Sequence, residues 1–148
     1  MRENKFRVWI DSMQKMVYDS GVINGTVFVN LGEGYEEIVN YKDIKLMQFT
    51  GMYDSNNIKI YEDDFIVCKK YLGTSVIPHL SGEDEYVEHH EEEIYKVVFE
   101  HGAFVLKNES HKTIKIWGNK LEVLGNAHKD NLDELKKLIR PENKIHYY

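Results

Sequence analysis

The stretch Val22-Ile23-Asn24-Gly25-Thr26-Val27-Phe28-Val29 decides the fold class of this 148-residue chain. Its central Asn-Gly pair suits the positive φ angles of a type I′ turn, and β-branched residues stand on both sides. The stretch therefore predicts a tight β-hairpin, and the segments around it carry related patterns.

Further strands are predicted on both sides of this hairpin. Upstream, residues 5–9 alternate polar and apolar side chains, which is the period-two pattern of a half-buried strand, and residues 15–18 resume extended structure. Downstream, Gly32 and Gly34 mark a reversal, and strands are expected within residues 36–41, 45–50 and 64–71. Residues 94–99 and 103–106 predict another hairpin, with Gly102 in its turn, before shorter strands at 114–117 and 121–124.

Two segments depart from the β pattern. Residues 81–93 are strongly acidic with few apolar anchors, so we expect a mobile surface loop there. Residues 130–140 predict an amphipathic helix, because Leu132, Leu135, Leu138 and Ile139 recur at spacings of three and four. Asp130 is the expected N-cap, and Pro141 is expected to end the helix.

Composition narrows the class of protein. Hydrophobic residues make up 42% of the chain and charged residues 30%, which supports a packed core. No apolar run approaches the roughly 20 residues of a membrane span, and no signal peptide is evident, so a cytoplasmic protein without a membrane partner is expected. The net charge of −6 argues against a protein that coats DNA without sequence specificity. Cys68 is the one cysteine of the sequence, which excludes an internal disulfide. Cys68 is predicted to be a buried, inert thiol.

Residues 2–9 read R-E-N-K-F-R-V-W, residues 45–56 read K-L-M-Q-F-T-G-M-Y-D-S-N, and residues 60–67 read I-Y-E-D-D-F-I-V. Together these segments resemble the opening R-x-x-K-F-R-x-W, the central L-M-Q-Y-T-G-L-x-D-x-N and the following I-Y-E-G-D-I-V of the YopX family of phage and prophage proteins. Weaker matches follow at residues 99–104 and 123–126. Asn57 and Asp63 stand where the family pattern has glycine, but Asn and Asp tolerate a left-handed backbone.

The strand pattern predicts a β meander or barrel with additional β-hairpins and the one C-terminal amphipathic helix, and the resemblance implies a mostly β fold with an SH3-like barrel. It also implies a bacteriophage or prophage source, and it brings no catalytic residues. We expect residues 1–148 to form a single YopX-like domain. A division into two β subdomains, residues 1–50 and 51–126, followed by the helix, remains open.

Two acidic clusters are the candidate sites. Glu62, Asp63 and Asp64 could line a ligand or metal site, yet neighbouring side chains of a strand point in opposite directions, which favours a structural role. His89 and His90 lie among glutamates and are the candidate metal ligands. They lack the H-E-x-x-H spacing of a zinc helix, so a solvated acidic loop is the favoured interpretation.

The leading functional hypothesis is a non-enzymatic phage accessory protein that binds a phage or host protein or assembles with itself, without a cofactor. Its basis is the resemblance, the lack of a catalytic constellation, and strand edges that invite pairing between chains. The alternative is a nucleic-acid-associated β-barrel with a basic N-terminus at Arg2, Lys5 and Arg7, and base-stacking aromatic residues. Those are Trp9, Tyr18, Phe28, Tyr35, Tyr41, Phe49 and Tyr53. A third hypothesis is a metal-dependent enzyme that uses Glu62 and Asp64 with a histidine.

Overall fold

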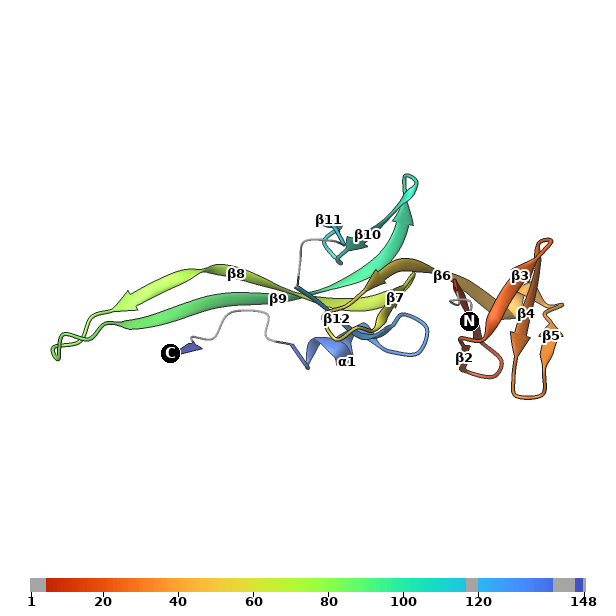
Figure 1. Ribbon diagram of the computed structural model, residues 1–148, viewed down its shortest axis with the longest axis horizontal. Coiled ribbons are helices and arrows are strands. Elements are labelled where there is room, and N and C mark those ends of the chain that lie inside the picture. The colour runs from red at the N-terminus through yellow and green to blue at the C-terminus, as the bar shows by residue number, and fades with distance from the viewer. Residues whose placement is uncertain (1–4, 117–119, 140–145, 148) are drawn as a thin grey trace.

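The computed structural model describes residues 5–116, 120–139 and 146–147. In these residues the chain is mostly β, as predicted, with thirteen strands, a 3₁₀ turn η1 (Tyr41–Asp43) and one short helix, α1 (Leu132–Lys136). Figure 1 shows an elongated molecule, with the N-terminal hairpins at one end and a long two-stranded projection at the other. No helix in the described part of the chain has the length and apolar character needed to cross a membrane.

The N-terminal part consists of two small antiparallel sheets. One has the order β2-β1-β6-β7, with β1 (Phe6–Ile10), β2 (Lys15–Val17), β6 (Ile44–Tyr53) and β7 (Lys59–Tyr61). The other has the order β3-β4-β5, with β3 (Ser20–Ile23), β4 (Thr26–Asn30) and β5 (Tyr35–Glu37). Asn24 and Gly25 have φ angles of 51° and 78° between β3 and β4, so the predicted hairpin is confirmed.

Strand β1 differs from the half-buried strand that its alternating pattern predicts. Val8 and Ile10 pack into a cluster with residues of β2 and β4. Arg7 and Trp9 are also buried, at 2% and 4% exposure. They are buried because their side of the strand contacts later segments of the chain. Arg7 contacts Asp64, and Trp9 contacts His128.

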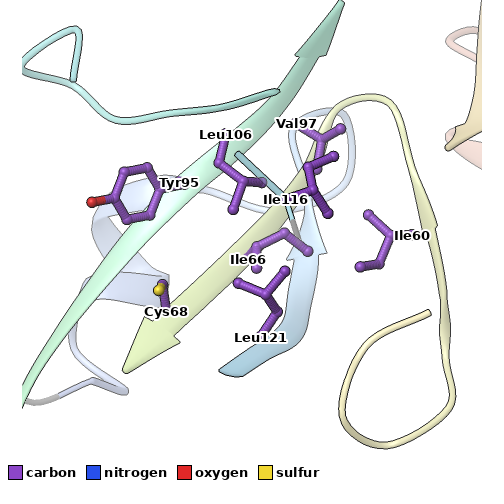
Figure 2. Packing of buried hydrophobic residues seen from close by; sticks show 8 residues of the cluster. All are labelled: Ile60, Ile66, Cys68, Tyr95, Val97, Leu106, Ile116 and Leu121. Atoms are coloured by element: carbon purple, nitrogen blue, oxygen red, sulfur yellow. The ribbon is translucent and has the colours of Figure 1, made fainter. Parts of the chain in front are cut away.

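The main sheet has the order β11-β10-β9-β8-β12. Its strands are β8 (Asp64–Ile77), β9 (Glu85–Glu100), β10 (Ala103–Lys107), β11 (Thr113–Lys115) and β12 (Lys120–Asn126), and β13 (His146–Tyr147) also pairs with β9. The sheet curls into a partial barrel around the core shown in Figure 2. That core contains Ile60, Ile66, Cys68, Tyr95, Val97, Leu106, Ile116 and Leu121. The burial predicted for Cys68 is confirmed, whereas a closed SH3-like barrel stays a prediction.

The acidic segment 81–93 is mostly strand, so the prediction of a mobile loop is wrong. Only residues 78–84 connect β8 to β9, and β9 begins at Glu85. In the β8–β9 register, Lys69 lies opposite Glu92 and Lys70 lies opposite Glu91. These opposite charges favour the pairing, which offsets the repulsion among the glutamates.

The C-terminal helix is shorter than predicted. Asn131, and not Asp130, caps α1, because its side chain accepts a hydrogen bond of 2.8 Å from the amide of Asp133. Leu135 is buried against Phe65 and Ile94, with Leu132 and Ile139 partly buried beside this cluster. Leu138 is 72% exposed, since α1 ends at Lys136, so its predicted place in the apolar stripe is wrong. Pro141 lies outside the described residues.

Candidate functional site

The turn between β7 and β8 holds the acidic cluster Glu62-Asp63-Asp64. Asp63 has a φ angle of 67° and Asn57, in the preceding turn, has 63°, so both adopt the left-handed backbone that the sequence predicts. The two aspartate side chains have separate partners, since Asp64 pairs with Arg7 and Asp63 with His128. The structure therefore gives both aspartates structural contacts that link distant segments of the chain.

Asp64 forms a buried ion pair with Arg7. Arg7 Nη2 lies 2.8 Å from Asp64 Oδ1 and donates a second hydrogen bond of 3.1 Å to the Glu62 carbonyl. The Tyr61 amide donates to the other Asp64 oxygen at 2.8 Å, and the Arg7 guanidinium lies 4.7 Å from the Tyr61 ring centroid. Burial raises the pKa of Asp64 to about 6, although Arg7 and the Tyr61 amide lower it.

The position of Arg7 bears on the nucleic-acid hypothesis. Its side chain is 3% exposed and paired with Asp64, so it adds no charge to the surface, and its expected part in a basic patch is wrong. Two further basic residues, Lys136 and Lys137, are also paired with acidic side chains. Lys136 forms an ion pair with Glu109, and Lys137 forms one of 3.2 Å with Glu134. Lys5 is exposed, and Arg2 lies outside the described residues.

A second contact runs beside this ion pair. The imidazole Nε2 of His128 lies 2.8 Å from an Asp63 carboxylate oxygen, and the His128 ring stacks on Trp9 with 6.1 Å between centroids. Trp9 belongs to β1, Asp63 precedes β8, and His128 follows β12. The two contacts together fasten the N-terminal sheets to the main sheet.

Two cavities lie along this junction. One, of about 430 Å³, is lined by Arg7, Asp64, Lys59 and apolar neighbours. The other, of about 540 Å³, is lined by Trp9 and Lys129, and both are bordered by Tyr18, Gly125 and Asn126. Arg7 and Asp64, which line the first cavity, are paired with each other.

His89 and His90 lie on β9 and point to different partners. The His89 ring nitrogen is 2.8 Å from Ser75 Oγ, whereas that of His90 is 2.9 Å from a Glu88 oxygen. Among the residues that the structure describes, no three or more His, Cys, Asp or Glu side chains gather as a metal site.

The most unusual surface lies on the projection formed by β8 and β9, which we call the arm and define as residues 70–91. It extends away from the main sheet (Figure 1). Six of its large hydrophobic side chains are exposed: Tyr71, Leu72, Val76, Ile77, Leu80 and Tyr86. Sequence reasoning missed this surface because the acidic half of the arm indicated a loop, although Thr74-Ser75-Val76-Ile77 carries a β-branched strand signal.

Part of the arm's apolar surface is organised by cross-strand pairing. Val76 lies opposite Tyr86, and each is 52% exposed. Tyr71 lies opposite His90, with 5.6 Å between the ring centroids. Residues directly opposite each other share a face of the sheet. Each pair therefore exposes its apolar or aromatic groups together on one face of the two-stranded arm.

The geometry defines an elongated, mostly β protein whose N-terminal sheets are joined to a curled sheet and whose longest hairpin projects from that sheet (Figure 1). Residues 5–132 match the family model described as YopX protein. The chain therefore belongs to the YopX family, and the family resemblance seen in the sequence is confirmed.

The fold has a counterpart among solved structures. The crystal structure of protein EF1440 from Enterococcus faecalis is similar, with a TM-score of 0.51 and 16% sequence identity. The similarity covers 84% of this chain and 93% of that chain. At this identity the likeness shows a shared fold alone. No protein with a curated description matches the chain.

Proposed function

We propose that this protein is a non-enzymatic self-assembling module, and that the arm is the element by which it binds a second copy of itself. The observation that carries the proposal is the set of six exposed hydrophobic side chains on the arm. Exposed apolar patches mark interaction sites on soluble proteins, and the cross-strand pair of Val76 and Tyr86 forms such a patch on one face of the arm. A two-stranded hairpin is also only marginally stable alone in water, so the part of the arm that β8 and β9 form by themselves gains stability from a partner.

The choice of a second copy rests on the charges of the arm. Residues Leu72 to Ser81, which include the exposed Val76, Ile77 and Leu80, carry no Asp, Glu, Lys or Arg. Two such segments can approach each other without repulsion between like charges. Every copy carries the same segment, so association about a two-fold axis buries it twice.

The oligomeric state of the full chain tests the proposal. Size-exclusion chromatography with light scattering should show a dimer at micromolar concentrations. The double variant Val76→Asp/Leu80→Asp should be monomeric, because it places charges in the apolar segment. Val39→Asp is the matched control, since Val39 is 83% exposed but lies outside the arm, and this variant should remain dimeric. A monomeric wild-type chain, or a dimer that both variants retain, would overturn the proposal.

We also propose that the protein serves as an accessory protein of a phage or prophage in the bacterial cytoplasm. The proposal is supported by membership of the YopX family and the phage sources that the sequence resemblance implies. The genes flanking the coding sequence test it. They should include replication, packaging or lysogeny functions, whereas a purely chromosomal neighbourhood would contradict it.

A further inference from the structure

The two outer edges of the arm differ. Within the arm, the outer edge of β9 is paired with β13 at Val87 and Glu88, and beyond the arm it is paired with β10 along Lys96–Glu100. The outer edge of β8 is paired with β12 only from Asp64 to Lys69. From Lys70 to Ile77, β8 pairs with β9 alone in the described part of the chain. The arm therefore has one partly covered edge and one open edge.

Only a short segment of the open edge lacks the usual protection against pairing. Edge strands are commonly guarded by lysine, proline or a bulge. Here a bulge lies at Leu72, between Tyr71 and Gly73, and Pro78 follows the strand. The residues between these two features, Gly73-Thr74-Ser75-Val76-Ile77, pair regularly with β9 and contain no charge. Among the described strands only β9 pairs with this segment, so its outward-facing backbone donors and acceptors can pair with another strand.

We infer that the Gly73–Ile77 edge of one chain pairs antiparallel with the same edge of a second copy, so that two arms join into a four-stranded sheet. This inference rests on the proposed self-assembly and specifies its geometry. Antiparallel pairing of identical edges satisfies a two-fold axis, because residues that lie equally far before and after the axis then face each other.

Charge at the two ends of the arm supports the antiparallel direction. The base of the open edge carries the exposed Lys69 and Lys70, which also lie opposite Glu92 and Glu91 of β9, whereas the tip of the arm carries the exposed Glu83 and Asp84. An antiparallel arrangement places the tip of one arm beside the base of the other, and so brings opposite charges together. A parallel arrangement would instead place lysines beside lysines and acidic residues beside acidic residues.

Single-cysteine cross-linking of the full chain tests this geometry. Ser75 is central in the segment, so two copies of Ser75→Cys lie near the two-fold axis and should convert to a disulfide-linked dimer under mild oxidation. The single variant Lys70→Cys should not form this disulfide. Lys70 lies at the base of the arm, and the bases of the two arms lie far apart in an antiparallel pair. The matched control is Tyr86→Cys, which is exposed on β9 and stands one strand away from the joint. The wild-type chain controls for the buried Cys68.

The outcomes separate this inference from the proposed self-assembly. Linking of Ser75→Cys without linking of Lys70→Cys or Tyr86→Cys supports edge pairing. Preferential linking of Tyr86→Cys in a dimeric protein shows that the arms stack face to face, which overturns edge pairing but keeps self-assembly. Preferential linking of Lys70→Cys shows a parallel arrangement and also overturns it. A monomeric chain by light scattering, with none of the variants linked, overturns both.

Discussion

The Arg7 guanidinium lies 2.8 Å from the Asp64 carboxylate, and the two side chains are 3% and 2% exposed. Arg7 lies on β1 and Asp64 begins β8, so a buried ion pair joins the N-terminal sheets to the strand that later forms the arm. Removal of one member of a buried ion pair destabilises the folded protein, because the other charge is left buried without a counter-charge. The joint therefore depends on both residues together.

Removal of Arg7 alone should strongly destabilise the protein. Arg7→Met leaves Asp64 buried without a counter-charge, and breaking such a pair costs about 3–5 kcal/mol. Urea unfolding near neutral pH measures the change. The double variant Arg7→Met/Asp64→Leu should recover much of the loss, because neither charge is then buried. A single variant as stable as the wild type would show that the pair contributes nothing to the joint.

The stability of the wild type should decrease as Asp64 ionises. Burial raises its pKa from 3.8 to about 6, so between these values the folded state binds more protons at this site than the unfolded state. The stability from this group is complete below pH 3.8 and is lost as the pH rises through about 6. Urea unfolding of the wild type and of Asp64→Asn across this range isolates the effect.

The result is the difference in free energy of unfolding between the wild type and Asp64→Asn as a function of pH. The wild type should lose stability relative to Asp64→Asn as the pH rises, because only the wild type must ionise a carboxyl group at this buried position. The comparison cancels the titration of the other groups. Parallel curves, or a wild type that gains stability relative to the variant, would show that the pKa of Asp64 is not raised.

Local signals in the sequence were sufficient for much of the fold but not for its long-range contacts. The Asn24-Gly25 hairpin was predictable because its turn residues are adjacent in the chain. The burial of Arg7 was not, since its partner Asp64 is 57 residues away, and alternation describes only one strand. The acidic segment 81–93 was mistaken for a loop for the same reason, because Glu91 and Glu92 lie opposite lysines of β8.

Truncation of Leu135 should destabilise the chain, whereas truncation of Leu138 should not. Leu135 is buried against Phe65 and Ile94 of its own chain, and Leu→Ala at such a site costs about 2–5 kcal/mol. Leu138 is 72% exposed, so Leu138→Ala should change stability by no more than about 0.5 kcal/mol. Thermal unfolding at several protein concentrations checks both variants. A Leu135→Ala loss that depends on concentration would place the helix against a second copy instead.

Gly125 should not tolerate a side chain, because the Asp130 carboxylate occupies the space that a Cβ atom would need. A Cβ at position 125 would lie only 2.8 Å from Asp130 Cγ, and that carboxylate also accepts a 3.0 Å hydrogen bond from the Asn126 amide. Gly125→Ala should therefore cost about 1–3 kcal/mol, as overpacking generally does.

Two further variants assign the cause of that loss. Gly21→Ala introduces the same methyl group where no atom lies within 4 Å, and it should leave stability unchanged or slightly raised. In an Asp130→Ala background the obstructing carboxylate is gone, so Gly125→Ala should cost much less than in the wild type. A double-mutant cycle by urea unfolding measures this coupling. An equal cost in both backgrounds would show that backbone conformation at Gly125, and not the Asp130 carboxylate, requires glycine at this position.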